Sequence, residues 1–429
     1  MRRFLVVLLV LVAVVSGCRK HHHSGGGGGS DVDIKNRVYI VNALSSTMTV
    51  IDLRDPENAE VLGVLPVAST PHMPEVSADF KKVYSSGTFG DAVTIYDAES
   101  LTKIKDLPVP AEPTHMSASP DNKYIAVCCE GTNEIAFIGV DSDTVEKIIP
   151  GMLTPHWVAF RNDMKFAYVA NINGYRITIL DLTTFTVSAH IFLAGHTDPL
   201  EATPVEEQGF AECFIDETGT LYSSHGEGEV CMRINTTTNM KIDEIPVGVD
   251  PWVAYVSPFG NSRVLVANQG SGDVTIINKG TGAPVATIGS GGQPVVNPNT
   301  GVTVRTTVTE DQVYGINFGN LGQKAYAGFR LNGAIQKINL ITDTAETVYS
   351  LTEGLPAPGF TQPMATTADQ RYLVICVTSQ PDFEDPGASG PVNRIVIWDT
   401  LTDKPVKIFD GLGTFPWSAT IPAGMNYCH

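Results

Sequence analysis

Charged side chains are scarce in this sequence, and several common catalytic motifs are missing. Charged residues make up 17% of the 429 residues, and the excess of acidic ones gives a net charge of −18. A chain this acidic is not expected to bind nucleic acid or an anionic membrane face, because both would repel it. The sequence also lacks a G-x-S-x-G elbow, a P-loop and an Asp-rich calcium loop. These absences remove the usual signatures of a serine hydrolase, a nucleotide-binding enzyme and a calcium-loop protein.

Cysteine is scarce too, and its spacing excludes several kinds of site. None of the seven cysteines belongs to a C-x-x-C or C-x-x-C-H motif, which argues against a zinc knuckle, a thioredoxin-type site and covalent c-type haem. Cys213 and Cys231 fall on the first and third strands of one predicted sheet, about 9.6 Å apart from strand spacing, which is too far for a disulfide unless the register differs. Cys128 and Cys129 are neighbours on one strand, so they point to opposite sheet faces and are predicted to pack between sheets.

Long hydrophobic runs are absent except at the N-terminus. Arg2 and Arg3 precede an apolar run over 4–15, which is shorter than the about 20 residues of a membrane span and fits a signal peptide. Residues 15–18, Val-Ser-Gly-Cys, resemble the bacterial lipobox. The prediction is therefore a signal peptide over 1–17, a lipidated Cys18, and a protein anchored in the cell envelope, facing the periplasm or the cell surface. An ordinary signal peptide with an incidental cysteine is the alternative.

The segment after Cys18 has the composition of a flexible tether. It contains three consecutive histidines and five consecutive glycines, and such a segment cannot bury a core. Residues 18–36 are therefore predicted to link the anchor to a folded domain over 37–429.

The rest of the chain is rich in turn-forming residues and has the pattern of an all-β protein. It holds most of the 40 glycines and 27 prolines, and its apolar residues follow short strand patterns rather than helical ones. A strand–turn–strand unit recurs in 38–53 (VYIVNALSSTMTVIDL), 167–182 (AYVANINGYRITILDL) and 264–278 (VLVANQGSGDVTIIN). Repeats spaced by about 40 to 50 residues are typical of a β-propeller with four strands per blade.

These repeats resemble the YVTN family of surface and exported β-propeller proteins. The resemblance covers nearly the whole chain after residue 36 and implies the fold, whereas propellers host many unrelated activities.

Eight blades account for the repeats. Seven are continuous in the sequence, and the eighth combines three strands from 37–67 with one strand from 417–426. Closing the ring with strands from both termini removes the open sheet edges that would invite aggregation. A misread blade near 289–311 would give the alternative count of seven. The seven continuous blades are expected over 70–110, 111–152, 153–195, 196–248, 249–289, 309–352 and 360–411.

The long insertions all fall on one predicted face of the propeller. The turns between first and second strands are short, whereas the blade links and second-to-third-strand turns carry the insertions 195–209, 289–310, 352–362 and 379–393. Because loops on rigid scaffolds carry function, this face is the predicted surface for a small-molecule or protein ligand. The alternative is drift in loop length without a function.

A recurring position at the start of each inner strand points to the centre of this face. It is predicted to hold His72, His115, His156, Trp252, Met364 and Trp417 around the channel mouth. Imidazole is a common ligand for transition metals, so the three histidines, with His196 and His225 in nearby loops, form a candidate copper or zinc site. The alternative is a structural role, with each imidazole hydrogen-bonded between blades. The acidic residues considered for this region are Glu75, Glu201, Glu206 and Glu207.

The sequence therefore favours an exported, lipid-anchored propeller that acts as a ligand- or protein-binding scaffold. A metal-dependent or redox propeller enzyme, built on the histidines at the channel mouth, is the alternative. A carrier of a haem- or quinone-type cofactor is compatible with eight blades, but no motif supports it.

Overall fold

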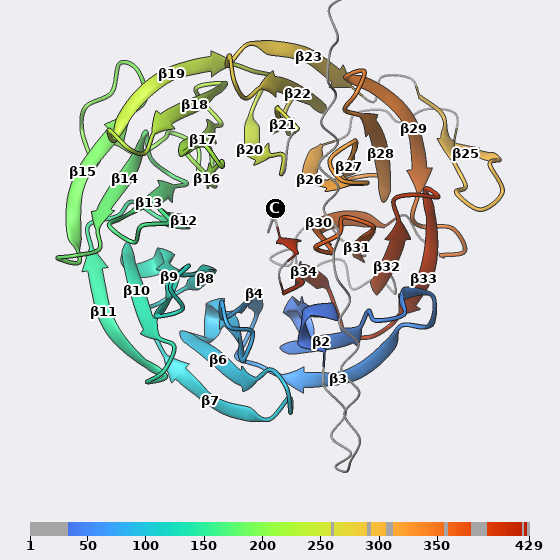
Figure 1. Ribbon diagram of the computed structural model, residues 1–429, viewed down its shortest axis with the longest axis horizontal. Helices are drawn as coiled ribbons and strands as arrows, with labels where there is room; N and C mark the ends of the chain where they lie inside the picture. The colour runs from blue at the N-terminus through green and yellow to red at the C-terminus, as the bar shows by residue number, and fades with distance from the viewer. Residues whose placement is uncertain are drawn as a thin grey trace, which may run out of the picture. The chain divides into compact units, whose positions relative to one another are not determined.

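Each sequence repeat forms a four-stranded antiparallel blade, and eight such blades surround a central axis (Figure 1). Two blades carry additional short strands, one of which is β35 (Met425–Asn426) beside β30 (Phe360–Thr366). The computed structural model describes residues 33–258, 261–289, 293–305, 312–355, 359–378, 393–422 and 424–426. This arrangement confirms the predicted eight-bladed β-propeller. The predicted signal peptide, Cys18 and most of the tether lie outside the described residues.

The blades are numbered in chain order. Blade 1 contains β1 (Arg37–Asn42), β2 (Thr47–Asp52), β3 (Glu60–Pro66) and β34 (Pro416–Thr420). Blades 2 to 4 contain β4 (Pro71–Val76), β5 (Lys82–Gly87), β6 (Ala92–Asp97) and β7 (Lys103–Pro108); β8 (Pro113–Ala118), β9 (Tyr124–Cys129), β10 (Glu134–Gly139) and β11 (Thr144–Pro150); and β12 (Pro155–Phe160), β13 (Phe166–Asn171), β14 (Arg176–Asp181) and β15 (Thr186–Phe192).

Blades 5 and 6 contain β16 (Phe214–Ile215), β17 (Thr220–His225), β18 (Val230–Asn235) and β19 (Met240–Pro246), and β20 (Pro251–Val256), β21 (Arg263–Asn268), β22 (Asp273–Asn278) and β23 (Pro284–Gly289). Blades 7 and 8 contain β26 (Val313–Gly319), β27 (Lys324–Phe329), β28 (Ala334–Asn339) and β29 (Thr344–Ser350), and β30 (Phe360–Thr366), β31 (Tyr372–Thr378), β32 (Asn393–Asp399) and β33 (Lys404–Asp410). The 3₁₀ helices are η1 (Ile34–Asn36), η2 (Ala43–Ser45), η3 (Pro56–Asn58), η4 (Thr88–Gly90) and η5 (Glu130–Thr132). None of the described helices is long and apolar enough to cross a membrane.

Blade 1 closes the ring with strands from both ends of the domain, as predicted. The C-terminal β34 pairs with β1 in an antiparallel register that joins Tyr39 to Thr420 and Ile40 to Ala419. The hydroxyl of Thr49 also donates to the carbonyl of Leu412 at 2.9 Å. The innermost strand of blade 1 is therefore β34, which lies among the last described segments.

The tyrosine of the repeat joins neighbouring blades. The hydroxyl of Tyr168 in blade 4 donates to the carbonyl of Thr236 in blade 5 at 3.0 Å, and Tyr222 in blade 5 donates to Lys279 in blade 6 at 3.1 Å. These tyrosines are fully buried, so each places an aromatic ring between two sheets and satisfies its own polar end. The repeated tyrosine is thus an inter-blade contact.

The asparagine that ends the second strand joins strands within a blade. The Nδ2 group of Asn171 donates to Oγ1 of Thr178 at 3.2 Å, and Asn268 does the same to Thr275 at 2.8 Å. Both asparagines are fully buried, so their amides need such partners.

The first strand of most blades has an irregular register close to its start. In blade 2 the pairing shifts between Pro71 and Pro74, and in blade 6 it shifts between Pro251 and Ala254. Proline has no N–H to donate to the neighbouring strand, and a bulge changes the direction in which the side chains of its extra residues point. The shift therefore frees the residues that follow the proline to line the channel mouth.

The described part of the 289–310 insertion lies on the outside of the ring. β24 (Val295–Val296) pairs in parallel with β29, the outer strand of blade 7, and β25 (Thr303–Arg305) pairs with β24 (Figure 1). The insertion therefore widens blade 7, and its described part does not cover the channel mouth. The 379–393 insertion lies outside the described residues except for its last residue.

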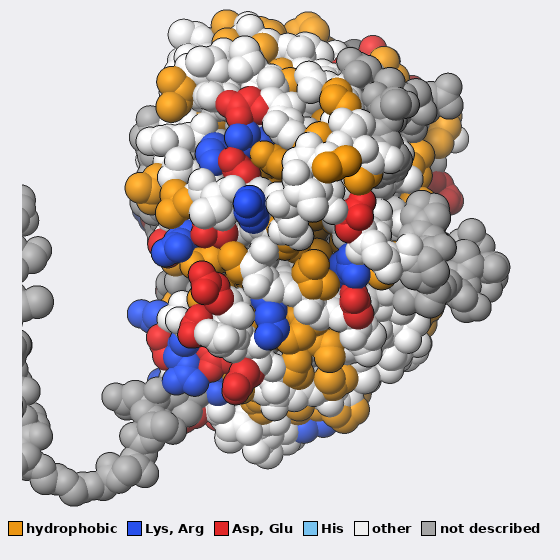
Figure 2. Space-filling model, turned by 90° about the vertical axis from the view of Figure 1, so that its right-hand side faces the viewer, with side chains coloured by type: hydrophobic (Ala, Val, Ile, Leu, Met, Phe, Trp, Pro, Cys, Tyr) orange, Lys and Arg blue, Asp and Glu red, His pale blue; other side chains and the backbone are white. Residues whose placement is uncertain are grey.

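On one side of the disc, acidic, basic and hydrophobic side chains are interspersed (Figure 2).

Candidate functional site

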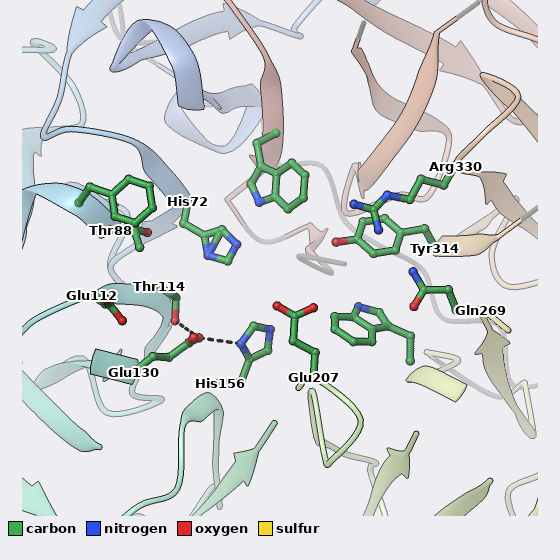
Figure 3. Close-up of a pocket in the computed structure, with 13 residues that line it drawn as sticks. His72, Thr88, Glu112, Thr114, Glu130, His156, Glu207, Gln269, Tyr314 and Arg330 are labelled. Atoms are coloured by element: carbon green, nitrogen blue, oxygen red, sulfur yellow. Dashed lines mark hydrogen bonds and ion pairs between the residues drawn. The ribbon is translucent and has the colours of Figure 1, made fainter. Parts of the chain in front are cut away.

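A cavity of about 210 Å³ opens where the inner strands begin, at the mouth of the central channel (Figure 3). We call it the mouth pocket. Its lining residues are His72, Thr88, Phe89, Glu112, Thr114, Glu130, His156, Glu207, Trp252, Gln269, Tyr314, Arg330 and Trp417.

The mouth pocket belongs to the face formed by the blade links and the second-to-third-strand turns, called the mouth face below. Glu112 and Glu207 lie in blade links, whereas Glu130, Gln269 and Arg330 lie in second-to-third-strand turns. Glu130 begins η5, which ends at a left-handed Asn133 with a φ of 58°. This tight turn brings Glu130 back over the start of the inner strands.

Strand pairing corrects two of the predicted mouth residues. Pro113 pairs with the end of β9 as Pro71 does with the end of β5, so Thr114 is the counterpart of His72, and His115 is the residue after it. In blade 8, Thr361 pairs with Val377 and so takes the place that Pro71 has in blade 2. Gln362 is therefore the counterpart of His72 in blade 8. The predicted alignment followed the Pro-x pattern, but the proline of blade 8 lies two residues farther along its strand.

Met364 consequently lies away from the mouth pocket. It is buried beside Tyr326 and Trp398 between blades 7 and 8. The other predicted residues stay at the mouth, because His72, His156, Trp252 and Trp417 all line the pocket.

The three histidines of blades 2 to 4 converge. The imidazole centroid of His115 lies 4.6 Å from that of His72 and 4.0 Å from that of His156. Nδ1 of His156 lies 2.7 Å from Oε1 of Glu130, and the same oxygen accepts a hydrogen bond from Thr114 Oγ1 at 2.6 Å (Figure 3). One ligand atom each from His115, Glu130 and His156 lie within 4.8 Å of one another.

This group has the donor set of a transition-metal site. Two imidazoles and a carboxylate are a common ligand combination for zinc, with the fourth position left to water or substrate. Ligand atoms of a tetrahedral zinc ion lie about 3.4 Å apart, given bonds of about 2.1 Å, so shifts of about 1 Å would close the group around an ion. Nδ1 of His156 lies against Glu130, so a metal bound to this ring would take Nε2.

Burial and neighbouring charges shift the pKa of two groups at the mouth pocket, His72 and Glu130. Burial lowers the pKa of His72 to about 4, against an opposing effect of Glu130, so its ring is neutral at physiological pH. Burial acts to raise the pKa of Glu130, but the charge of His156 and the hydrogen bonds from His156 and Thr114 outweigh it and lower the pKa. The mouth pocket therefore presents the neutral imidazole of His72 and the ionised carboxylate of Glu130.

The opposite side of the mouth pocket has a different chemistry. Gln269, Tyr314 and Arg330 face the histidines across the cavity (Figure 3). The rings of Trp252 and Tyr314 stack at 6.2 Å between centroids, and the Arg330 guanidinium lies 4.2 Å from the Tyr314 ring centroid. Trp417 completes this aromatic side, with its ring centroid 6.3 Å from that of Tyr314.

His196 and His225 form a separate cluster around Tyr175. Their rings stack on that of Tyr175, with centroid distances of 3.7 Å and 5.1 Å. Nδ1 of His196 lies 3.0 Å from Oε1 of Glu201, and Nδ1 of His225 accepts the backbone N–H of Gly228 at 3.0 Å. Within the described residues, neither histidine joins a group of three metal-binding side chains.

The acidic residues singled out in the sequence have different positions. Glu207 lines the mouth pocket, and its side chain lies between His156 and the aromatic side (Figure 3). It lies beside blade 5, where Phe210 pairs with the end of β17 and Ala211 is therefore the counterpart of His72. The small side chain of Ala211 leaves space for Glu207. Glu206 is exposed and is not among the lining residues, and Glu201 pairs with His196 as described above.

Glu75 lies farther along β4, where its Oε1 accepts the backbone N–H of Ala118 in blade 3 at 3.2 Å. Burial raises the pKa of Glu75 to about 8 against the effect of that hydrogen bond. An acid whose pKa is higher in the folded than in the unfolded state contributes its full stabilisation of the fold at a pH below the unfolded-state pKa. This contribution is lost as the pH rises toward the folded-state pKa. The stability of the protein is therefore expected to fall between about pH 4.5 and pH 8, by about 1.4 kcal/mol per unit for this group.

Replacing Glu75 by glutamine is expected to remove this slope, because the amide oxygen still accepts the Ala118 N–H but does not ionise. Urea unfolding of wild type and Glu75→Gln at pH 5, 6.5 and 8 measures the slope of stability against pH. Glu57→Gln, at an exposed position, is the matched control. The buried carboxyl of Glu212, whose pKa burial also raises, retains a second slope in every variant. Equal slopes in wild type and Glu75→Gln would contradict the assignment.

Sequence reasoning missed Thr114, Glu130, Gln269, Tyr314 and Arg330. Tyr314 follows Val313 in blade 7, where no proline marks the position, although counting from the end of β27 identifies it. Glu130, Gln269 and Arg330 all directly follow a second strand. That shared place in the repeat is the signal that would have found them.

Comparison with known proteins supports the fold. No protein-family profile matches the sequence, and no curated protein matches it. Dihydro-heme d1 dehydrogenase NirN in complex with DHE is similar in structure, with a TM-score of 0.69 and 15% identity over 92% of this chain and 77% of that one. The likeness shows the fold alone.

Two further solved structures are similar at lower scores. Apo AztD from Citrobacter koseri has a TM-score of 0.59 and 12% identity over 89% of this chain and 96% of that one. Hydrazine synthase from Kuenenia stuttgartiensis has a TM-score of 0.54 and 15% identity over 78% of this chain and 96% of that one.

Proposed function

We propose that the protein is an exported, lipid-anchored propeller that binds a zinc or copper ion at the mouth of its central channel. The observation that carries the proposal is the group of His115, Glu130 and His156, whose ligand atoms lie within 4.8 Å of one another. His115 and His156 would each give a ring nitrogen. Glu130 uses Oε1 for His156 and Thr114, which leaves Oε2 for the ion.

The size of the mouth pocket favours an ion over a large cofactor. Pockets for drug-sized ligands usually measure about 300 to 1,000 Å³, whereas this one measures about 210 Å³. A tetrapyrrole is larger than most drug-sized ligands, so the likeness to NirN in complex with DHE does not favour such a ligand here. A metal ion with its water, or with one small ligand, fits the volume.

Direct metal binding tests the proposal. The full chain is purified without an affinity tag, with His21, His22 and His23 replaced by serine so that the tether adds no ligands. Elemental analysis after addition of Zn²⁺ or Cu²⁺ is expected to give one ion per chain. At a free concentration one hundred times Kd, the ion would stabilise the folded state by about 2.7 kcal/mol. Unchanged melting temperatures with both ions would refute the proposal.

The lipid anchor has its own test. Its support is the basic start, the apolar run over 4–15 and the lipobox-like sequence ending at Cys18. Cys18→Ser is expected to block lipidation and release the protein from the membrane fraction, and intact-mass measurement of wild type should show the lipid. A Cys18→Ser protein that still sediments with membranes, together with a wild type that carries no lipid, would refute the anchor.

A further inference from the structure

The face opposite the mouth face is formed by the first-to-second-strand and third-to-fourth-strand turns of the blades. In the described parts of these turns, three large aliphatic side chains are exposed, and all three lie in the neighbouring blades 7 and 8 (Figure 1). Leu321 is 69% exposed, Ile341 is 71% exposed and Leu401 is 53% exposed. We call these three residues the aliphatic patch.

The three side chains of the aliphatic patch lie near one another. Leu321 and Ile341 line the same shallow hollow between blades 6 and 7. The backbone N–H of Asn320 donates to Oγ1 of Thr400 at 3.2 Å, and this hydrogen bond joins the residues that precede Leu321 and Leu401. The three side chains therefore form one patch across blades 7 and 8.

The fold does not require aliphatic side chains at two of these positions. Ile341 and Leu401 each donate their backbone N–H to the side-chain oxygen of the residue two positions earlier, at 2.9 Å and 2.8 Å. This contact fixes the backbone of the turn and leaves the side chain of the donating residue in solvent. Three other blades make the same turn with a polar residue in that place, namely Glu99, Thr183 and Thr237.

Leu321 stands where the turn favours a polar residue. It lies three positions before the second strand of blade 7 and has a left-handed φ of 55°, which is unfavourable for an apolar L-residue. Blades 2, 3, 4 and 8 have an aspartate three positions before the second strand, and its Oδ1 accepts the backbone N–H two residues later. A leucine cannot accept that hydrogen bond, so its presence at an exposed position indicates a role outside the fold. These aspartates are Asp79, Asp121, Asp163 and Asp369.

Two ion pairs flank the aliphatic patch. Nη2 of Arg263, which lines the hollow beside Leu321, lies 2.7 Å from Oδ2 of Asp343. Nζ of Lys324 lies 3.0 Å from Oδ2 of Asp403. Each pair brings one positive and one negative charge, so neither gives the patch a net charge. The patch therefore fits an apolar partner without a net charge of its own.

The described chain enters the domain on this same face. The carbonyl of Asn36, the last residue of η1, accepts the backbone N–H of Leu53 at 2.6 Å in the third-to-fourth-strand turn of blade 1. Blade 1 follows blade 8 in the ring (Figure 1). Cys18 and Asp33 are 15 positions apart, and such a segment spans at most about 50 Å when fully extended. A lipid on Cys18 would therefore hold the domain to the membrane from this face.

We propose that the aliphatic patch docks on the surface of a lipid bilayer without net charge. Leu321, Ile341 and Leu401 would enter the boundary between headgroups and acyl chains, while the mouth face, on the other side of the disc, would stay open to solvent. This inference rests on the proposed lipid anchor, which would keep the patch near the lipid at a high effective concentration and so strengthen a contact that is weak by itself. The net charge of −18 disfavours an anionic bilayer.

A fluorescent reporter in the patch tests the proposal. The chain from Cys18 onward, which keeps the whole described domain, is coupled through Cys18 to a maleimide lipid in phosphatidylcholine vesicles. Cys428→Ser leaves Cys18 as the reactive thiol, because the cysteines of the described domain are buried. Leu401→Trp then places an exposed tryptophan in the patch, and acyl-chain-brominated phosphatidylcholine quenches a tryptophan that enters the bilayer.

Thr183→Trp is the matched control for this reporter. Thr183 is exposed and has the same place in the third-to-fourth-strand turn of blade 4, on the same face but on the other side of the ring. The emission added by Leu401→Trp is expected to be quenched at least threefold more than that added by Thr183→Trp. Adding Leu321→Asn and Ile341→Thr to the Leu401→Trp protein is expected to lower its quenching to the level of the control.

The outcomes separate the patch from the anchor. Equal quenching of the two reporters, or no quenching of either, would refute docking of the patch on the bilayer. Absence of lipid on Cys18 in the cell would refute the anchor alone, because the chemically coupled protein still reports on the patch. Sedimentation velocity of the uncoupled protein is expected to show a monomer. A dimer that Leu321→Asn with Ile341→Thr dissociates would show that the patch binds a second copy of the chain, and would overturn the lipid assignment.

Discussion

His156→Ala is expected to lower the zinc affinity of the protein at least a hundredfold. A metal bound to His156 would take Nε2, because Nδ1 lies against Glu130, and the change also removes one of the two hydrogen-bond partners of Glu130 Oε1. His115→Ala is expected to have an effect of similar size, because His115 belongs to the same group of three. The double variant should lose little more than either single one, since a site with one ligand missing is already disrupted.

A structural role for the histidines predicts a different result. Each change would then cost about 1 to 3 kcal/mol of stability through the lost hydrogen bonds, the losses would add, and zinc would not affect the melting temperature. His225→Ala is the control, because His225 is buried on the same face but lies in the separate cluster around Tyr175. Zinc titrations of the four variants and wild type, followed by calorimetry, distinguish the two roles. Equal zinc affinity in all five proteins would exclude His115 and His156 as ligands.

Removal of residues 415–429 is expected to abolish cooperative folding. The deletion takes away β34, the inner strand of blade 1, and with it the buried side chains of Phe415, Trp417 and Ile421. Burying a large apolar side chain contributes about 1.5 to 3 kcal/mol, so the three contribute about 5 to 9 kcal/mol. Native proteins are stable by only about 5 to 15 kcal/mol. The deletion also exposes one edge of β1, which invites aggregation.

Circular dichroism and calorimetric melting measure this effect. Deletion of tether residues 19–30 is the control and should leave the melting temperature almost unchanged. A synthetic peptide spanning 415–429, added to the truncated protein, is expected to restore part of the transition by pairing with β1. A truncated protein that melts as sharply as wild type, and within a few degrees of it, would show that closure through β34 is unimportant for stability.

The sequence predicted the architecture because the fold repeats. Eight copies of one strand pattern, several of them with a buried tyrosine or asparagine at a fixed position such as Tyr168 and Asn171, indicate the same blade structure repeatedly. Blade boundaries and the composite blade 1 follow from that repetition. The 289–310 insertion departs from the pattern, and its pairing with β29 depends on a parallel contact that no local signal specifies.

The mouth pocket was predictable only in part, because its walls join residues from six or more blades. The histidines were visible as a series, but a bulge changes which residue faces the axis, so Thr114 and Gln362 rather than His115 and Met364 are the counterparts of His72. Glu130 is near His156 only because two adjacent blades bring a turn and a strand start together. Such contacts between blades leave no pattern along the chain.

Closure of the ring between β1 and β34 also has a consequence for the order of folding. The hydrogen bond between Thr49 and Leu412 joins residues 363 positions apart, and contacts of such long range form slowly because the intervening chain must first be ordered. The first sheet cannot be completed until β34 has been made. During synthesis the nascent chain therefore keeps an unpaired β1 edge. A chain that crosses a membrane as an extended polypeptide would pair β1 with β34 only on the far side.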